Sequence, residues 1–311
     1  MLKKLKEQEG YYDKNKNKGV MFFSASSVGD TKQLVAFGIR EILVSYFYIR
    51  KGLTYYDEVL PFLKSEGGLF MTDSGAFSFM ATGFVEEMRK EEYWIPYLEE
   101  YVAWVRAHSE YIYVVANLDL DKIVGREIVR KWNKKYFEPL EKIVDVVYVA
   151  HEDESIDPHG IEHFEEYCKK YKYVGINQSQ KKFAHRFFLL AKKYKVRVHG
   201  FAWTEIRILR RYPFFSVDST SWLSGVRYGT TFNYDGKNFK SWDTKQKFRR
   251  KGQRIKYEEA GVDFSKVTKK DHRDDVNRMN LLAWLGFRKE YIKIANLLLT
   301  NKEAGKYERK R

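Results

Sequence analysis

Short apolar runs that alternate with helical patterns constrain the fold of this chain more than any other feature. From about residue 20 to residue 220, eight runs rich in Val, Ile, Phe and Tyr are separated by helical segments. This alternation is typical of repeated βα units and a parallel sheet. Eight runs favour an α/β fold of the (β/α)8 TIM-barrel type, although a doubly wound open sheet would give the same periodicity. The predicted strands are Val20–Ser24, Ile42–Tyr48, Leu69–Thr72, Ile112–Asn117, Val146–Ala150, Tyr173–Ile176, Arg197–Phe201 and Phe214–Val217.

The predicted helices are amphipathic. Apolar residues recur at helical spacing in Ile95–Ala107, and apolar and basic residues fall on separate faces in Lys182–Tyr194. A third helix, His163–Tyr171, carries Cys168, for which a structural role is expected. As the chain has one cysteine, an internal disulfide and a multi-cysteine zinc site are both excluded.

The character of the sequence changes after Asp218, which suggests an addition to the barrel. Ser224–Gly236 is rich in Gly, Thr and Tyr, and Asp274–Leu299 has an apolar stripe that predicts a helix packed on the barrel. We therefore divide the chain into three parts. These are a basic N-terminal segment (residues 1–19), a catalytic barrel core (20–235), and a basic loop with a C-terminal helical extension (236–311).

The charge of the chain indicates a polyanionic partner. Lys and Arg number 57 against 42 Asp and Glu, a formal charge of +15, so nucleic acid is the expected partner. The aromatic content of 17% adds surfaces on which unpaired bases could stack. Lys237–Lys256 holds nine basic residues against Asp243 alone, and a solvated basic surface is the alternative reading of this run. The residues expected to contact phosphates are Lys247, Arg249, Arg250, Lys251 and Arg254.

The N-terminus argues against export and membrane insertion. It is charged and has no apolar core of signal-peptide length, and no later stretch approaches the roughly 18 apolar residues that a bilayer crossing needs. We expect a soluble cytoplasmic protein without membrane contact.

Three carboxylates are predicted at the ends of strands. Asp73 follows Leu69–Thr72, Asp119 comes shortly after Ile112–Asn117, and Asp218 follows Phe214–Val217. In a parallel barrel the strand ends converge on one mouth, where the chemistry takes place. Each residue alone could be a helix N-cap or a loop anchor. Together, two carboxylates on opposite sides of a sugar could displace a group at the anomeric carbon, one attacking it and the other transferring a proton.

The residues around these carboxylates resemble a known family. Asp73-Ser74-Gly75-Ala76-Phe77-Ser78 resembles the Asp-Ser-Gly-Gly-Phe-Gln signature of tRNA-guanine transglycosylases. The resemblance covers about residues 20 to 230. It implies that Asp73 is the proton-transfer aspartate, that Asp119 reads the guanine edge and that Asp218, in Phe215–Trp222, is the nucleophile.

Further substrate-binding roles follow from the same resemblance. The run at residues 73–78 contributes Ser74, Gly75 and Phe77. Apart from the resemblance, Phe77, Phe201 and Trp203 are candidates to sandwich a flipped base, with a place in the core as the alternative. His151 stands where the family has a glutamine that contacts the base, with a hydrogen bond across the barrel mouth as the alternative. Gly175 stands where a glycine-rich turn presents backbone atoms, and Gly200 precedes Phe201 in the segment before the nucleophile.

The sequence departs from the family at several positions. The tRNA enzymes carry a zinc site of three cysteines and a histidine after the nucleophile, and this chain has no cysteine there. Ala76 and Ser78 replace the second Gly and the Gln of the signature. The run Ser216–Trp222 is more similar to the phage and bacterial DpdA branch, which inserts 7-deazaguanines into DNA.

The resemblance thus implies a pentosyltransferase that replaces guanine in DNA by a 7-deazaguanine, such as 7-cyano-7-deazaguanine, through a covalent aspartyl-glycosyl intermediate. It needs no metal and no cofactor, and the location includes the host cytoplasm during phage infection. Two alternatives remain: a tRNA-guanine transglycosylase, and a non-catalytic nucleic-acid-binding subunit. The need for a helicase-like partner, the choice of 7-deazaguanine and the oligomeric state stay open.

Overall fold

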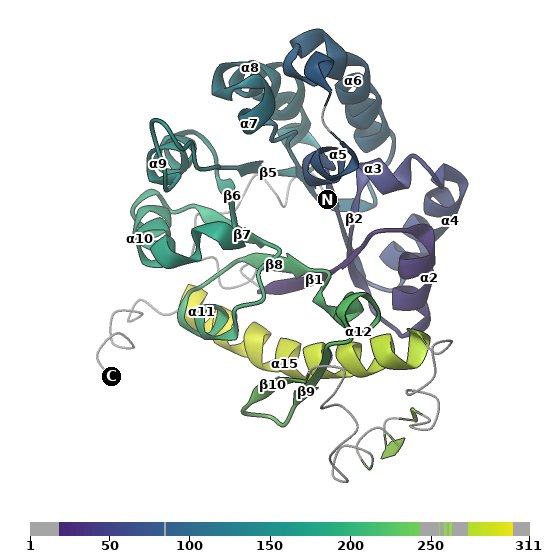
Figure 1. The fold of residues 1–311 in the computed structure, drawn as a ribbon. Helices are drawn as coiled ribbons and strands as arrows, with labels where there is room; N and C mark the ends of the chain where they lie inside the picture. The colour runs from purple at the N-terminus through teal and green to yellow at the C-terminus, as the bar shows by residue number, and fades with distance from the viewer. Residues whose placement is uncertain are drawn as a thin grey trace.

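The structure is a computed structural model that describes residues 19–83, 85–242, 255, 258–259, 261–262 and 273–300. It contains a closed barrel of eight parallel strands, each paired with the next and the last with the first, which confirms the predicted α/β barrel (Figure 1). The strands are β1 (Val20–Ala25), β2 (Glu41–Ser45), β3 (Leu69–Asp73), β4 (Ile112–Ala116), β5 (Asp145–Val149), β6 (Tyr173–Asn177), β7 (Arg197–Phe201) and β8 (Ser216–Ser219).

Helices surround this barrel. The α-helices are α2 (Val28–Ala36), α3 (Tyr46–Ile49), α4 (Leu53–Ser65), α5 (Ala76–Thr82), α6 (Glu91–Ala107), α7 (Asp121–Val124), α8 (Arg126–Trp132), α9 (Ile161–Lys170), α10 (Ala184–Tyr194), α11 (Ile206–Arg211), α12 (Ser224–Tyr228) and α15 (Arg273–Thr300). Shorter turns are the 3-10 helices η2 (Glu86–Arg89), η4 (Glu138–Lys142), η5 (Gln178–Phe183) and η6 (Ser221–Leu223), and the π-helix η3 (Asn133–Phe137).

Of the predicted strands, Arg197–Phe201 matches at both ends, five others differ by one residue at one or both ends, and two differ by more. The second strand ends at Ser45 rather than Tyr48, because the Ser45 side chain accepts a hydrogen bond from the Phe47 backbone N–H and so caps α3. The eighth strand is Ser216–Ser219 instead of Phe214–Val217, so that Asp218 lies within the strand and not after it. The sequence pattern missed both shifts because apolar residues continue beyond the ladder in each case.

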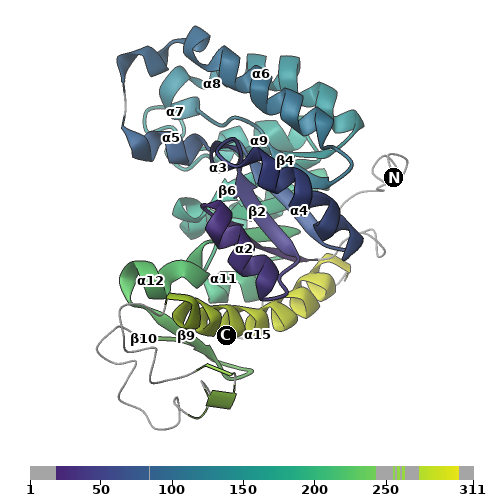
Figure 2. The same ribbon diagram turned by 90° about the vertical axis from the view of Figure 1, so that its right-hand side faces the viewer.

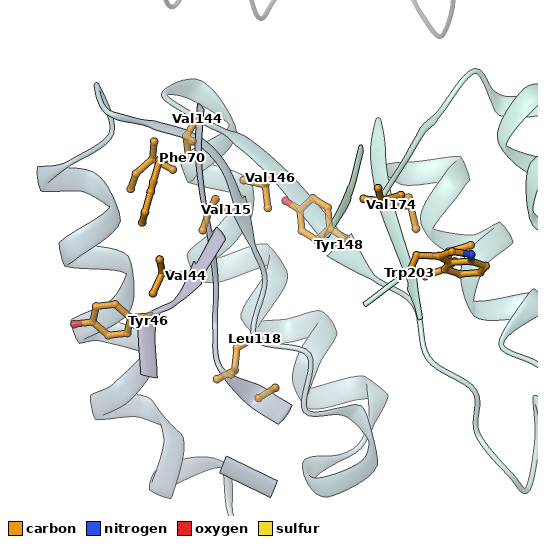
Figure 3. Packing of buried hydrophobic residues seen from close by; sticks show 14 of the residues in the cluster. Val44, Tyr46, Phe70, Val115, Leu118, Val144, Val146, Tyr148, Val174 and Trp203 are labelled. Carbon is orange, nitrogen blue, oxygen red and sulfur yellow. The ribbon is translucent and has the colours of Figure 1, made fainter. Parts of the chain in front are cut away.

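Each strand separates two apolar layers. On β1, Val20 and Phe22 belong to the cluster that fills the barrel interior, while Met21 and Phe23 belong to the larger cluster between the barrel and its helices. Side chains of a strand alternate between its two faces, which accounts for this division. Figure 3 shows buried residues of the larger cluster, among them Val44, Phe70, Val115, Val146 and Val174.

A helix and a hairpin after β8 extend the barrel. Strands β9 (Thr231–Tyr234) and β10 (Phe239–Trp242) pair antiparallel, and α15 lies between this hairpin and the barrel (Figures 1 and 2). The Tyr291 hydroxyl of α15 donates to the Phe214 carbonyl oxygen at 3.2 Å, so the helix packs on the barrel. Helices α5 to α8 group at the opposite end of the molecule (Figure 2). The predicted phosphate contacts Lys247, Arg249, Arg250, Lys251 and Arg254 lie outside the described residues.

Within the described ranges, none of the helices combines the length and the apolar character that crossing a membrane requires.

Candidate active site

On several barrel strands, the last residue whose side chain faces the barrel interior is polar. Ser24 follows Val20 and Phe22 on the inner face of β1, and Asp73 follows Met71 on β3. Ser45 and Asn177 are the last residues of β2 and β6. Since every strand of a parallel barrel ends at the same face, these side chains and Asp218 lie at one mouth.

Asp218 is a buried carboxylate held by three donors. The Ser24 hydroxyl donates to its Oδ2 at 2.6 Å, and the Ala202 backbone N–H donates to its Oδ1 at 3.0 Å. His199 Nε2 lies 3.3 Å from the same Oδ1. Buried carboxylates require such partners. The geometry therefore fits a fixed nucleophilic or electrostatic role.

The backbone turn that carries one of these donors is strained. Ala202 has a φ of 53°, in the left-handed region that non-glycine residues rarely adopt. In this conformation the Ala202 N–H reaches the Asp218 carboxylate, and the next N–H, of Trp203, donates to the Asp218 carbonyl at 3.0 Å. Strain of this kind costs of order 1 to 3 kcal/mol and persists where the surroundings enforce it.

We predict that Ala202→Gly leaves the free energy of unfolding unchanged or raises it by about 1 kcal/mol, because glycine adopts this backbone conformation without a Cβ clash. Ala202→Val, with a β-branched side chain, should lower it by about 1 to 2 kcal/mol. Urea unfolding followed by circular dichroism measures both. Equal stability of the two variants would contradict the assignment of strain to this residue.

Asp73 differs from Asp218 in its electrostatic surroundings. Burial, together with the charges of Asp218 and Asp119, raises the pKa of Asp73 to about 7, against the opposing hydrogen bonds from the Ser45 side chain and the Gly75 backbone N–H. That backbone N–H donates to Asp73 Oδ1 at 2.8 Å. The charges of Asp218 and Asp119 both act on Asp73, and Asp73 and Asp218 lie on β3 and β8 near the carboxyl-terminal ends of these strands. A carboxyl group with a pKa near neutrality can both give and take a proton.

The residue after Ser74 in the signature-like run must be glycine for two reasons. Gly75 has a φ of +83°, and a Cβ there would lie 2.6 Å from Phe47 Cβ and 2.6 Å from Ser45 Oγ. The space beside its Cα is thus filled by the β2–α3 segment. Gly75 places its N–H on Asp73 and brings that strand end against Ser45, which orients the carboxyl group.

Asp119 takes part in a hydrogen-bonded chain across the mouth. Its Oδ2 lies 2.7 Å from His151 Nε2, His151 Nδ1 lies 2.9 Å from Asn177 Nδ2, and the Ser74 hydroxyl donates to Asp119 Oδ1 at 3.3 Å. Burial acts to lower the pKa of His151, but the hydrogen bond and charge of Asp119 outweigh it and raise that pKa. Both oxygens of Asp119 are engaged, so a base edge that bound there would share or displace these partners.

The aromatic residues predicted to sandwich a base differ in exposure. Phe77, on α5, is 79% exposed, and Phe201 is partly exposed at the end of β7. Trp203 is 1% exposed and packs on Phe214 with ring centroids 4.9 Å apart, so its predicted role in stacking was wrong (Figure 3). The apolar indole fills the layer between barrel and helices, where it is removed from water.

Two predicted binding glycines make room for rings. A Cβ on Gly175 would lie 2.5 Å from the Phe201 ring, and a Cβ on Gly200 would lie 2.8 Å from the Phe214 ring. Their absent side chains allow Phe201 to turn into the barrel and Phe214 to pack behind β7. Both glycines act through packing.

Sequence reasoning missed several residues of the site. Ser24, Ser45, Asn177 and His199 contact the predicted residues directly or complete their hydrogen bonds. The sequence feature that could have indicated them is a polar residue that follows apolar residues on the inward-facing side of a strand. It is weak in any one strand, and only barrel closure brings the strands together.

Searches of protein-family models, of curated proteins and of solved structures found no match to the chain. Among the residues that the structure describes, no group of three or more His, Cys, Asp or Glu is arranged to hold a metal ion. Cys168 is buried in α9, and burial raises the pKa of its thiol, which suits a structural role.

Proposed function

We propose that this chain is a base-exchanging glycosyltransferase that replaces guanine in DNA by a 7-deazaguanine, with Asp218 as the nucleophile and Asp73 as the proton-transfer group. The observation that carries the proposal is the pairing of a firmly hydrogen-bonded carboxylate with a carboxyl group whose pKa is raised to about 7 by burial and by its acidic neighbours. Two carboxyl groups in different environments are what a double displacement at an anomeric carbon requires.

The first step forms a covalent intermediate. A guanine nucleotide is turned out of the helix, since C1′ and the base edge are not accessible together in a stacked duplex. An Asp218 oxygen attacks C1′, the bond from C1′ to guanine N9 breaks, and the protonated Asp73 gives its proton to the departing base. The products are a glycosyl ester of Asp218, free guanine and ionised Asp73.

The second step reverses the first with another base. Ionised Asp73 takes the N9 proton of the incoming 7-deazaguanine, N9 bonds to C1′ and the ester bond to Asp218 breaks. Two inversions at C1′ restore the original configuration, and Asp73 returns to its protonated form. Asp119 accepts hydrogen bonds from guanine N1 and the 2-amino group, and Phe77 offers an exposed ring for stacking.

Label exchange tests the substrate. We expect radiolabelled guanine to enter guanine-containing DNA, and not tRNA, when either polymer is incubated with the protein. If the label entered tRNA alone, the same reaction would be assigned to tRNA instead of DNA. Binding of DNA without any incorporation would favour a non-catalytic subunit.

A further inference from the structure

A buried chain of hydrogen bonds leads from Asp218 into the barrel interior. Behind the carboxylate, His199 lies on β7 with no exposed surface. Its Nε2 faces Asp218 Oδ1 at 3.3 Å and its Nδ1 lies 2.5 Å from the Ser216 hydroxyl oxygen. That hydroxyl also hydrogen-bonds to the Tyr173 hydroxyl of β6. These three residues lie on neighbouring strands, with His199 beside both Ser216 and Gly175 in the ladder.

The direction of hydrogen donation along these hydrogen bonds follows from Tyr173, which lies at their inner end. Tyr173 is 1% exposed, and burial raises the pKa of its hydroxyl, so the phenol keeps its proton. Within the described residues, the Tyr173 hydroxyl has Ser216 as its hydrogen-bond partner. A buried hydroxyl hydrogen without an acceptor is costly, so Tyr173 donates to Ser216. Ser216 has one hydrogen and gives it to His199 Nδ1. The remaining imidazole hydrogen is then on Nε2, which faces Asp218.

The two oxygens of Asp218 are consequently not equivalent. Oδ1 accepts from His199 Nε2 and from the Ala202 N–H, which occupies both of its lone-pair directions. Within the described residues, Oδ2 has the Ser24 hydroxyl as its hydrogen-bond donor, which leaves one of its lone-pair directions without a donor from that part of the chain. Ser24 is itself anchored, since Trp222 Nε1 donates to its carbonyl oxygen at 2.9 Å.

We infer that Tyr173 and Ser216 set the tautomer of His199, and that His199 fixes Asp218 so that Oδ2 is the atom that attacks the sugar. His199, Ser216 and Tyr173 are positioning residues: they act through Asp218 and do not touch the substrate. This inference rests on the proposed function for its catalytic part, whereas the tautomer of His199 is a property of the protein alone.

The tautomer is measured directly by long-range ¹H–¹⁵N correlation on protein labelled with ¹⁵N-histidine. The chain has seven histidines, and the His199 signals are assigned by their loss in His199→Gln. We expect the Nε2–H form in the wild-type protein and a mixture of the two tautomers in Ser216→Ala. An Nδ1–H form in the wild-type protein overturns the inference.

The exchange kinetics of two variants with different expected losses test the catalytic part of the inference. In Ser216→Ala we expect kcat for guanine exchange to fall about 10- to 100-fold with KM unchanged, because a misplaced reacting group costs up to about 100-fold. Tyr173→Phe keeps the Ser216–His199 contact and should lose less, about 3- to 10-fold, and it replaces the first variant if Ser216→Ala does not fold. His185→Gln, on the exposed side of α10, is the matched control and should behave as wild type.

Together, the tautomer measurement and the exchange kinetics distinguish a failure of this inference from a failure of the proposed function. If the wild-type protein exchanges guanine and Ser216→Ala and Tyr173→Phe do so equally fast, the inference is overturned while the proposed function stands. If the wild-type protein exchanges no guanine, the proposed function fails, and with it the catalytic part of the inference. The tautomer measurement then supports or overturns the hydrogen-bond chain alone.

Discussion

Asp218→Asn should abolish guanine exchange, with a loss of at least about 10⁴-fold in kcat, because an amide oxygen cannot form the glycosyl ester on which the double displacement depends. The wild-type protein, incubated with a guanine-containing oligonucleotide and denatured rapidly, should show a covalent protein–DNA band on a denaturing gel. The variant should show none. The substitution preserves the size of the side chain, so the contacts from Ser24 and Ala202 change little in position.

Asp57→Asn is the matched control for this experiment. Asp57 lies on α4, where its carboxylate pairs with His108 Nε2 at 3.0 Å on the outer surface. The same chemical change there should leave the covalent band and the exchange rate intact. A covalent band that persists in Asp218→Asn would mean that another side chain is the nucleophile.

The fold could be predicted from the sequence because its main signal is repeated. Because eight apolar runs carry the pattern, the prediction survives an error in any one of them, and the closed barrel has a strand at each. Boundaries were less predictable, as at Ser45, where a cap decides the strand end, and at β8, which begins at Ser216 although the apolar Phe215 before it already hydrogen-bonds to Val20 and Val198. Hydrogen bonding sets these ends, and it leaves little trace in hydropathy.

The carboxylates of the candidate site could be selected from the sequence, but the residues that hydrogen-bond to them could not. An aspartate beside a buried strand is conspicuous, so Asp73, Asp119 and Asp218 could be selected from the sequence. The direction in which Trp203 points depends on the left-handed turn at Ala202, which turns the indole away from the mouth. Such a turn is a product of tertiary packing, and alanine gives no local sign of it.

The hydrogen bonds place the two similar side chains of Asp73 and Asp218 in different environments. Asp218 receives donors from β1, β7 and the β7–α11 turn. The pKa of Asp73 is instead raised by burial and by the charges of Asp218 and Asp119, which outweigh the Ser45 and Gly75 donors. These surroundings favour a proton on Asp73 near neutral pH.

Asp73→Asn should lower kcat for guanine exchange by about 10² to 10⁴-fold, the usual contribution of a general acid and base. Binding of the oligonucleotide should change far less, because the amide retains the size and polarity of the carboxyl group. Filter binding and label exchange on the same preparation separate the two quantities. A variant that exchanges guanine at the wild-type rate would remove Asp73 from the reaction.

The same substitution should change how stability depends on pH. The pKa of Asp73 is about 7 in the folded protein against 3.8 as the ordinary value. Between these values the folded state holds a proton that the unfolded state has lost, so the wild-type protein loses stability as the pH rises through this window. Asparagine does not titrate. The free energy of unfolding of Asp73→Asn, relative to wild type, should therefore rise by about 2 kcal/mol from pH 5 to pH 8.

Urea unfolding at both pH values measures this difference, and Glu58→Gln is its control. Glu58 is exposed on α4, so neutralising it should give a difference from wild type that is nearly independent of pH. A flat difference for Asp73→Asn as well would mean that Asp73 is ionised throughout this range in the folded protein. It could then serve as a base for the incoming 7-deazaguanine but would hold no proton to give to the departing guanine, and the first step would need another acid.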